Sequence, residues 1–373
     1  MRIVRLANFV TPTSGGLRTA LHELGAGYAA AGHEPVLVVP GAAARDERTP
    51  AGRVITLPGP VVPGLGGYRV ITARRALRRL LEELAPDRIE VSDRTTLRWL
   101  GPWARAAGVR SVMVSHESLS ALLRLYGPLG WPLGRLADPV NRATAARFDT
   151  VVCTTGWAAA EFARLGVPNL VRVPLGVDLA TFSPERFDPG LRSRLAARGK
   201  ALLVHCGRLS PEKRPDRSIR ALAELRRRGV PAVLAVAGDG PLRARLTRLA
   251  DGLPVRFLGH LADRDAVAAL LATADVALAP GPVETFGLAA LEALASGTPV
   301  VATRDSALPE VIGPAGAAVA DDPADYARAI EDLLSDPALR ERARARAERY
   351  GWPAAVRGFL DAHGLTGTPA RPR

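Results

Sequence analysis

Cysteine and lysine are both scarce in this sequence. Two cysteines, Cys153 and Cys206, occur among 373 residues, and they lie far apart. We therefore expect free thiols in an intracellular protein and no disulfide framework. No cluster of Cys and His has the spacing of metal ligands, so we expect no bound metal and no other cofactor.

Long apolar runs are also lacking. No run approaches the roughly 20 residues that a membrane-spanning helix requires. The first seven residues, MRIVRLA, are too short and interrupted for a signal peptide and are typical of a first strand. We expect a cytoplasmic protein, with attachment to the inner face of the plasma membrane as an open alternative.

The charge is strongly positive and comes almost wholly from arginine. The net charge is +13, and the lysines are Lys200 and Lys213. Such a chain suits nucleic acid, an anionic membrane or an anionic small substrate. The arginines are spread over many predicted helices without a helix-turn-helix, RNA-binding or zinc-finger signature, which argues against nucleic acid as a partner.

Strand-like and helix-like segments alternate along the chain, which predicts an α/β protein with two parallel sheets. Between the two series lies a segment rich in turn residues, 182–190. We predict an N-terminal Rossmann-like domain over 1–178, a second over 179–351, and a tail without periodicity over 364–373. Ligands of open α/β sheets bind beyond the carboxyl ends of the strands, so we expect the site in a cleft between the domains.

A basic loop follows the predicted strand at 201–205. It reads GRLSPEKRP and contains Arg208 and Lys213. A guanidinium can chelate phosphate oxygens, and an ammonium beside it can supply a point charge. The loop therefore suits a diphosphate leaving group, which it could stabilise without a metal. A solvated basic loop is the alternative.

A second motif, ETFGLAALE, follows the predicted strand at 276–279 and carries Glu284 and Glu292. A helix beginning near Gly287 would aim its free N–H groups at anionic oxygens. Both carboxylates would suit neutral hydroxyls of a sugar and a ribose. Glu292 could instead be an ordinary exposed helix residue.

Several glycine loops also follow predicted strands. Gly15 and Gly16 would let the backbone approach a ligand closely, although the dinucleotide fingerprint is missing. Two later loops, with Gly238 and with Gly259, His260 and Leu261, could hold a nucleobase through main-chain contacts. Tight turns would explain all three loops as well.

Polar residues end two strands of the first series. His116 follows the strand at 110–115 and could bind a sugar hydroxyl or manage charge at the reacting carbon. Asp93 and Arg94 follow the strand at 88–92 and are candidates for acceptor binding. A structural histidine and a helix N-cap at Asp93 are the alternatives.

An amphipathic helix is predicted over 69–84. One face is leucine-rich and the other is basic, through Arg74, Arg75, Arg78 and Arg79. Such a helix suits an anionic membrane surface. The apolar stretches 58–68 and 119–136 could add lipid contacts, whereas an ordinary surface helix would carry the same pattern.

Together these motifs resemble glycosyltransferase family 4, the retaining enzymes of the GT-B fold. The resemblance spans almost the full chain. It implies that Glu284 contacts the donor sugar, that Glu292 contacts the ribose, and that Phe286, Gly287 and Leu288 contribute main-chain contacts. It further implies that Arg208 and Lys213 bind the diphosphate, that Gly15 and Gly16 form the glycine loop, and that His116 lies by the reacting sugar. The last helix, 352–363, would cross back onto the first domain.

A narrower similarity is to the actinobacterial phosphatidylinositol mannosyltransferases that add the third mannose. It rests on segments such as EVSDR at 90–94, CTTG at 153–156 and APGP at 279–282. It implies GDP-mannose as the nucleotide-sugar donor and a mannosylated phosphoinositide as the glycolipid acceptor. A UDP-sugar transferase with a soluble acceptor and a non-catalytic two-domain sugar-binding protein are the alternatives. A nicotinamide dehydrogenase is disfavoured by the missing fingerprint.

Overall fold

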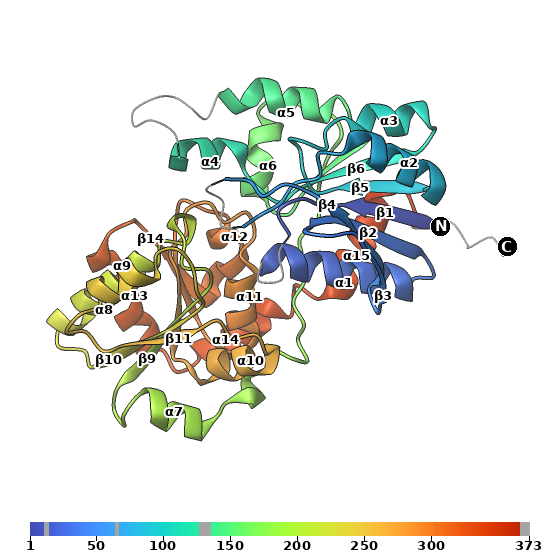
Figure 1. Ribbon diagram of the computed structural model, residues 1–373. Coiled ribbons are helices and arrows are strands. Elements are labelled where there is room, and N and C mark those ends of the chain that lie inside the picture. Colours follow the sequence, from blue (N-terminus) through green and yellow to red (C-terminus); the bar gives the residue numbers. More distant parts are fainter. Residues whose placement is uncertain (11–14, 64–66, 127–135, 366–373) are drawn as a thin grey trace. The chain divides into compact units, whose positions relative to one another are not determined.

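The computed structural model describes residues 1–10, 15–63, 67–126 and 136–365. The chain folds into two compact units, one made of Met1–Gly176 with Trp352–Arg373 and the other of Val177–Gly351 (Figure 1). Thr13 and Ser14 of the glycine loop, parts of the apolar stretches 58–68 and 119–136, and the tail from 366 onward lie outside the described residues.

The first unit is built on an eight-stranded sheet in the order β3-β4-β2-β1-β5-β6-β7-β8. β3 runs antiparallel to β4, and the other paired strands run parallel. The strands are β1 (Arg2–Leu6), β2 (Glu34–Gly41), β3 (Arg45–Thr49), β4 (Gly52–Pro58), β5 (Arg88–Val91), β6 (Arg110–Ser115), β7 (Thr150–Cys153) and β8 (Leu170–Arg172).

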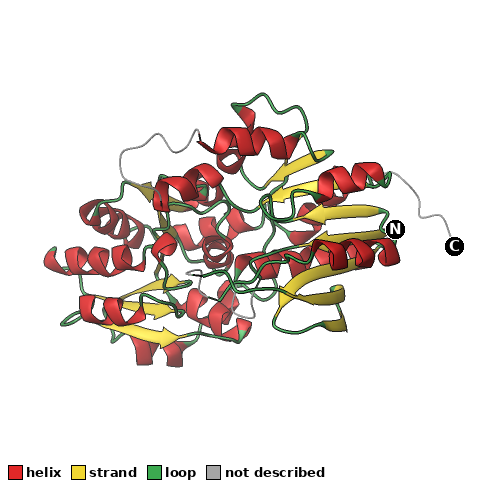
Figure 2. Cartoon of the chain, turned by 45° about the horizontal axis from the view of Figure 1, so that its top comes forward, coloured by secondary structure: helices red, strands yellow, loops and turns green. Residues whose placement is uncertain are grey.

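Helices cover both faces of this sheet (Figure 2). They are α1 (Gly16–Ala30), α2 (Arg74–Leu84), α3 (Leu100–Ala106), α4 (Leu119–Tyr126), α5 (Asp138–Ala145), α6 (Gly156–Ala163) and α15 (Trp352–Ala362). Alternate strand residues such as Val4 and Leu6 pack with Leu77 of α2 and Phe162 of α6 in one core. The side chain of Arg5 lies on the other face, where it reaches the Leu21 carbonyl of α1.

Helix α15 completes that other face, although it comes from the end of the chain. A Cβ on Gly27 of α1 would lie 2.2 Å from Val356, so the two helices pack closely. Beneath them the buried Glu90 carboxylate accepts hydrogen bonds from Arg5 (2.8 Å) and Tyr28 (2.7 Å), and it lies 3.2 Å from His363 Nε2. Burial alone would raise the pKa of Glu90, but Arg5, His363 and Tyr28 hold it far below its usual range.

The second unit has a six-stranded parallel sheet in the order β11-β10-β9-β12-β13-β14. Its strands are β9 (Ala201–Cys206), β10 (Ala232–Ala237), β11 (Val255–Gly259), β12 (Val276–Ala279), β13 (Val300–Thr303) and β14 (Gly316–Val319). Its α-helices are α7 (Pro189–Leu195), α8 (Pro215–Arg227), α9 (Arg243–Leu249), α10 (Arg264–Thr273), α11 (Leu288–Ala295), α12 (Leu308–Ile312), α13 (Pro323–Leu334) and α14 (Leu339–Ala347). Short 3-10 turns lie at Pro184–Arg186, Pro211–Lys213 and Gly313–Ala315.

The prediction of an α/β protein with two parallel sheets is confirmed. The sequence did not predict β3, because its residues RDERT are all polar and have no alternating apolar pattern. The helix predicted over 69–84 begins at Arg74 instead. Its first residues stay extended because the Asn8 side chain accepts from Ile71 N and the Phe9 N–H donates to the Arg69 carbonyl.

Candidate active site

Two loops of the second unit meet because their strands are neighbours. β9 pairs with β12, so the loop 207–214 and the loop 280–287 leave the same edge of the sheet. The Lys213 ammonium forms an ion pair with the Glu284 carboxylate. The backbones of the two loops are also close to each other, since a Cβ on Gly281 would lie 2.8 Å from the Glu212 carbonyl oxygen. The structure thus brings Lys213 and Glu284, 71 residues apart, into direct contact.

A carboxylate also sits inside the basic loop. Ser210 Oγ donates to Glu212 Oε1 at 2.6 Å, and Arg208 Nη1 lies 4.0 Å from the same oxygen. Burial would raise the pKa of Glu212, but the Ser210 hydroxyl, the loop backbone, Arg208 and Lys213 together lower it. Glu212 is therefore ionised at neutral pH and partly balances the two cations.

The motif from Glu284 to Glu292 forms the predicted helix start. Gly287 precedes α11 with φ of +84°, and a Cβ there would lie 2.2 Å from Leu308 Cδ2, so the position favours glycine. The first N–H groups of α11 have no partner within the helix. The ring of Phe286 is buried and meets Tyr350 edge-to-face at 6.0 Å. Burial raises the pKa of Glu292 to about 7, so this carboxyl is half protonated near neutral pH.

The glycine loops after β10 and β11 join the same edge. A Cβ on Gly238 would lie 1.9 Å from the Gly207 carbonyl oxygen, and the Gly238 N–H donates to Gly259 at 2.7 Å. His260 is exposed and Leu261 is half-buried. The predicted donor-binding residues of this unit therefore lie on loops at one edge of the sheet, and neighbouring loops are in contact.

In the first unit, His116 follows β6 and faces the end of β5. Its Nε2 lies 3.2 Å from Ser92 Oγ. Burial lowers the pKa of the imidazole to about 4, so the ring is neutral at neutral pH. A small cavity adjoins it, lined by Phe9, Ser92, Asp93, Arg94, Val114, Ser115, His116 and Glu117. Phe9 adopts φ of +59°, a conformation that non-glycine residues seldom take.

Asp93 and Arg94 line this cavity, but both are buried and form hydrogen bonds with other groups of the protein. Asp93 accepts from Asn8 (2.8 Å) and from the backbone and hydroxyl groups of Thr95 and Thr96. The Arg94 guanidinium pairs with Glu161. These contacts show a structural task for both residues, and their contact with an acceptor stays a prediction.

Gly15 and Gly16 open α1, with Gly15 as its N-cap. Among the described residues, no atom outside its chain neighbours lies within 4 Å of the place that a Cβ on Gly15 would take. Among the described residues, no group of three or more His, Cys, Asp or Glu is arranged to hold a metal ion.

Comparison with known proteins places the chain in a family. Residues 15–176 match the family described as Glycosyl transferase 4-like domain, and residues 191–350 match Glycosyl transferases group 1. A Mycobacterium tuberculosis protein named GDP-mannose-dependent alpha-(1-6)-phosphatidylinositol dimannoside mannosyltransferase is 52% identical over 375 residues, which cover 100% of this chain and 98% of that protein. The chain belongs to glycosyltransferase family 4.

Other relatives agree with this assignment. A Mycolicibacterium smegmatis GDP-mannose-dependent alpha-(1-6)-phosphatidylinositol monomannoside mannosyltransferase is 32% identical over 81% of this chain and 85% of its own length. Sucrose-phosphate synthase from Thermosynechococcus elongatus superposes with a TM-score of 0.79 at 21% identity, covering 98% of this chain and all of that one. WaaG, a glycosyltransferase involved in lipopolysaccharide biosynthesis, gives 0.70 at 21% identity, over 98% and 100%. The family 4 glycosyltransferase thus has the predicted GT-B fold.

The amphipathic helix of this glycosyltransferase is packed differently from a membrane-inserting one. Leu77, Leu81 and Leu84 of α2 are buried in the core, whereas the basic side chains Arg74, Arg75, Arg78 and Arg79 are exposed. The apolar face is therefore occupied by the protein itself. Within the described ranges, every helix is too short or too polar to traverse a lipid bilayer.

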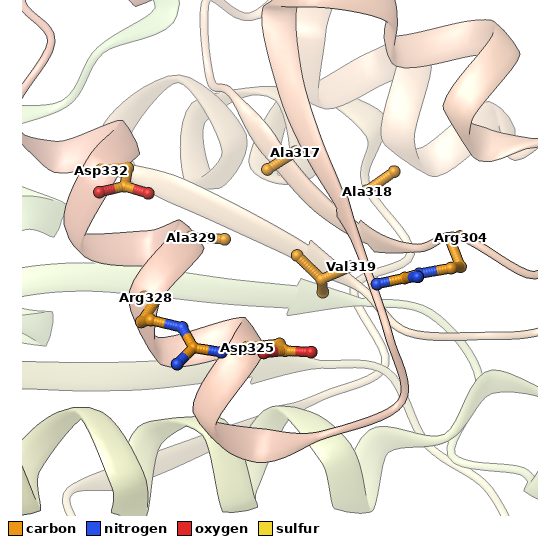
Figure 3. A pocket seen from close by; sticks show the side chains of 8 residues that line it. All are labelled: Arg304, Ala317, Ala318, Val319, Asp325, Arg328, Ala329 and Asp332. Carbon is orange, nitrogen blue, oxygen red and sulfur yellow. Dashed lines mark hydrogen bonds and ion pairs between the residues drawn. The ribbon is translucent and has the colours of Figure 1, made fainter.

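A separate hollow of about 350 Å³ lies between β14 and α13 (Figure 3). Arg304 borders it on one side, and on the other Arg328 pairs with Asp325 of the same helix. It contains none of the predicted site residues of the glycosyltransferase.

Three residues that contact predicted site residues were not themselves predicted: Ser92, Glu161 and Glu212. Two of them had a signal in the sequence, because Ser92 precedes Asp93 and Glu212 lies between Arg208 and Lys213. Glu161 had none, since it reaches Arg94 across 67 residues from another helix.

Proposed function

We propose that this enzyme transfers mannose from GDP-mannose to phosphatidylinositol dimannoside, forming an α-(1-6) linkage. The single observation that carries the proposal is the 52% identity over the whole chain to the mycobacterial enzyme of that name. The grouping of Arg208, Lys213 and Gly287 on loops of one sheet edge supports it from the geometry.

The diphosphate of the donor would bind the loop 207–214 and the start of α11. Arg208 supplies a planar guanidinium, Lys213 supplies a point charge, and the first N–H groups of α11 supply further donors. These groups stabilise the charge that develops on GDP as the bond from mannose C1 to the phosphate oxygen breaks. Gly15 and Gly16 of the first unit would approach the same diphosphate.

Glu284 has a different task, which its ion pair suggests. Its carboxylate forms an ion pair with Lys213. When the donor diphosphate takes over the ammonium, the Glu284 carboxylate is released to accept hydrogen bonds from mannose hydroxyls. Glu292 would accept from the ribose, and Gly238, Gly259, His260 and Leu261 would lie near the guanine.

Transfer would proceed with retention through attack on the same face of the sugar from which GDP departs. The acceptor oxygen forms the new bond to C1, and its proton passes to the departing phosphate oxygen. His116 is neutral at neutral pH and can donate or accept one hydrogen bond while it orients the sugar. Asp93 and Arg94 would border the acceptor.

The exposed arginines of α2 would attract the anionic membrane in which the acceptor lies. Each cation near such a surface contributes about 1 kcal/mol. Because the leucine face of α2 is buried in the core, this attachment is electrostatic and does not depend on helix insertion.

A donor screen tests the proposal. The purified enzyme is given phosphatidylinositol dimannoside with GDP-mannose, UDP-glucose or UDP-galactose, and the product is identified by mass spectrometry. We expect product with GDP-mannose alone, and larger thermal stabilisation by GDP than by UDP. Transfer from a UDP-sugar to a soluble acceptor, with none from GDP-mannose, would contradict the proposal.

A further inference from the structure

We infer that the buried Arg94–Glu161 ion pair is a positioning device that fixes residues 116–120, and with them the His116 ring. Its effect on catalysis rests on the proposed function of His116. Its effect on the conformation of residues 116–120 does not depend on that function.

Arg94 is the first half of the device. It is 5% exposed, and its Nη1 contacts Glu161 Oε1 (2.5 Å) and Asn141 Oδ1 (3.0 Å). Its Nη2 donates to the Glu117 carbonyl. The guanidinium also lies over the Phe162 ring, 5.5 Å from the centroid. The Arg94 guanidinium therefore bridges α5, α6 and Glu117, the residue that follows His116.

Glu161 is the second half, and it holds the next part of the same segment. It is 3% exposed, and its Oε2 accepts from Ser118 Oγ at 3.2 Å and from the Ser120 N–H at 3.1 Å. Burial would raise the pKa of Glu161, but Arg94 and the bonds from Ser120 lower it. The carboxylate stays ionised and keeps these bonds at neutral pH.

The His116 ring and the backbone next to it are both held by residues that follow β5. Ser92, two residues before Arg94, contacts the imidazole, while Arg94 contacts the carbonyl of the next residue. Ser115 Oγ donates to that carbonyl as well, at 2.9 Å. Side chains outside residues 116–120 therefore hold both the His116 ring and the backbone carbonyl of the residue that follows it.

Stability is a weak reason for burying such a pair. Two desolvated charges often stabilise a fold no better than apolar side chains of similar volume. A charged pair does, however, impose a geometry that apolar contacts would not. The geometry fixed here is that of the residues around His116.

Arg94→Lys tests the inference. A lysine keeps the charge beside Glu161 but lacks the fork that reaches Asn141 and the Glu117 carbonyl together. We expect kcat to fall by about 10- to 100-fold, because a displacement of about 1 Å can cost that much. The KM for GDP-mannose should stay unchanged, since the main donor loops lie in the other unit. Hydrogen exchange in the peptide 116–126 should become faster.

Arg105→Lys is the matched control. Arg105 is an exposed arginine of the same unit that also donates to backbone carbonyls, those of Ala146 and Arg147. Neither carbonyl belongs to residues 116–120, so the substitution should leave kcat and the exchange of 116–126 unchanged.

Should Arg94→Lys fail to fold, Glu161→Gln serves instead, because it removes the charge and keeps a hydrogen-bonding group of the same length. Native kcat and native exchange of 116–126 in the folded variant would overturn the inference. Faster exchange together with a fully active His116→Ala variant would instead refute the role of His116 and leave the positioning of 116–120 standing.

Discussion

Lys213→Ala is the substitution that tests the diphosphate site most directly. The Lys213 side chain is 32% exposed and that of its partner Glu284 is 20% exposed, so the ion pair is partly in water. Such a pair contributes about 0–1 kcal/mol to stability, and its loss should lower Tm by at most a few degrees. The fold should therefore survive.

The effect on turnover should be much larger. A hydrogen bond to a charged group contributes about 1.5–3 kcal/mol, which corresponds to a fall of about 10- to 150-fold in kcat/KM. The Glu284 carboxylate left without its cation would also repel the incoming diphosphate, which adds to the loss. Transfer of radiolabelled mannose and calorimetric titration with GDP measure the two effects.

Lys213→Arg is the control, because it keeps the positive charge and should recover part of the activity. If the alanine variant transferred mannose at the native rate and bound GDP with native affinity, the assignment of Lys213 to the diphosphate would be refuted.

Four further outcomes are expected. GDP affinity should rise from about pH 6 to about pH 8 as Glu292, whose pKa is about 7, loses its proton, and Glu292→Gln should flatten this dependence in titrations. Since that pKa is raised in the folded state, the contribution of Glu292 to stability should be lost as the pH rises from about 4.5 to about 7, and an unchanged urea midpoint across this range would argue against it. Gly287→Ala should destabilise the fold by about 1–3 kcal/mol in urea unfolding, because of its positive φ and the nearby Leu308 methyl, whereas Gly15→Ala should change little. Replacing the exposed arginines of α2 by Gln should abolish sedimentation with anionic vesicles and leave the behaviour with neutral vesicles unaltered; the four are Arg74, Arg75, Arg78 and Arg79.

The sequence was most informative where a polar residue follows a buried strand. Arg208, Glu284 and His116 were all selected on that ground, and each lies in the segment that follows a strand in the structure. That β9 and β12 are neighbours could not be read from the sequence, because the order of strands in a sheet depends on crossover connections. The ion pair between Lys213 and Glu284 follows from that order, and no local pattern predicts it.

Sequence reasoning was weaker where burial decides the role of a charge. Asp93 and Arg94 are of the residue types that bind ligands, yet both are buried and form hydrogen bonds or ion pairs with other residues of the protein. The leucines of α2 pack on the sheet of their own unit, whereas the pattern alone would equally suit a lipid surface. Periodicity shows that a helix has an apolar face but does not show what covers it.

Helix α15 has a consequence for how the polypeptide matures. The first unit lacks one of its covering helices until residue 362 has left the ribosome, so the nascent chain must hold residues 1–176 in an incomplete form while the second unit is being synthesised. During that interval Glu90 has Arg5 and Tyr28 as partners but not His363. A recombinant fragment ending at residue 176 would keep this unfinished surface permanently, and we expect it to aggregate unless residues 352–365 are supplied as a separate peptide.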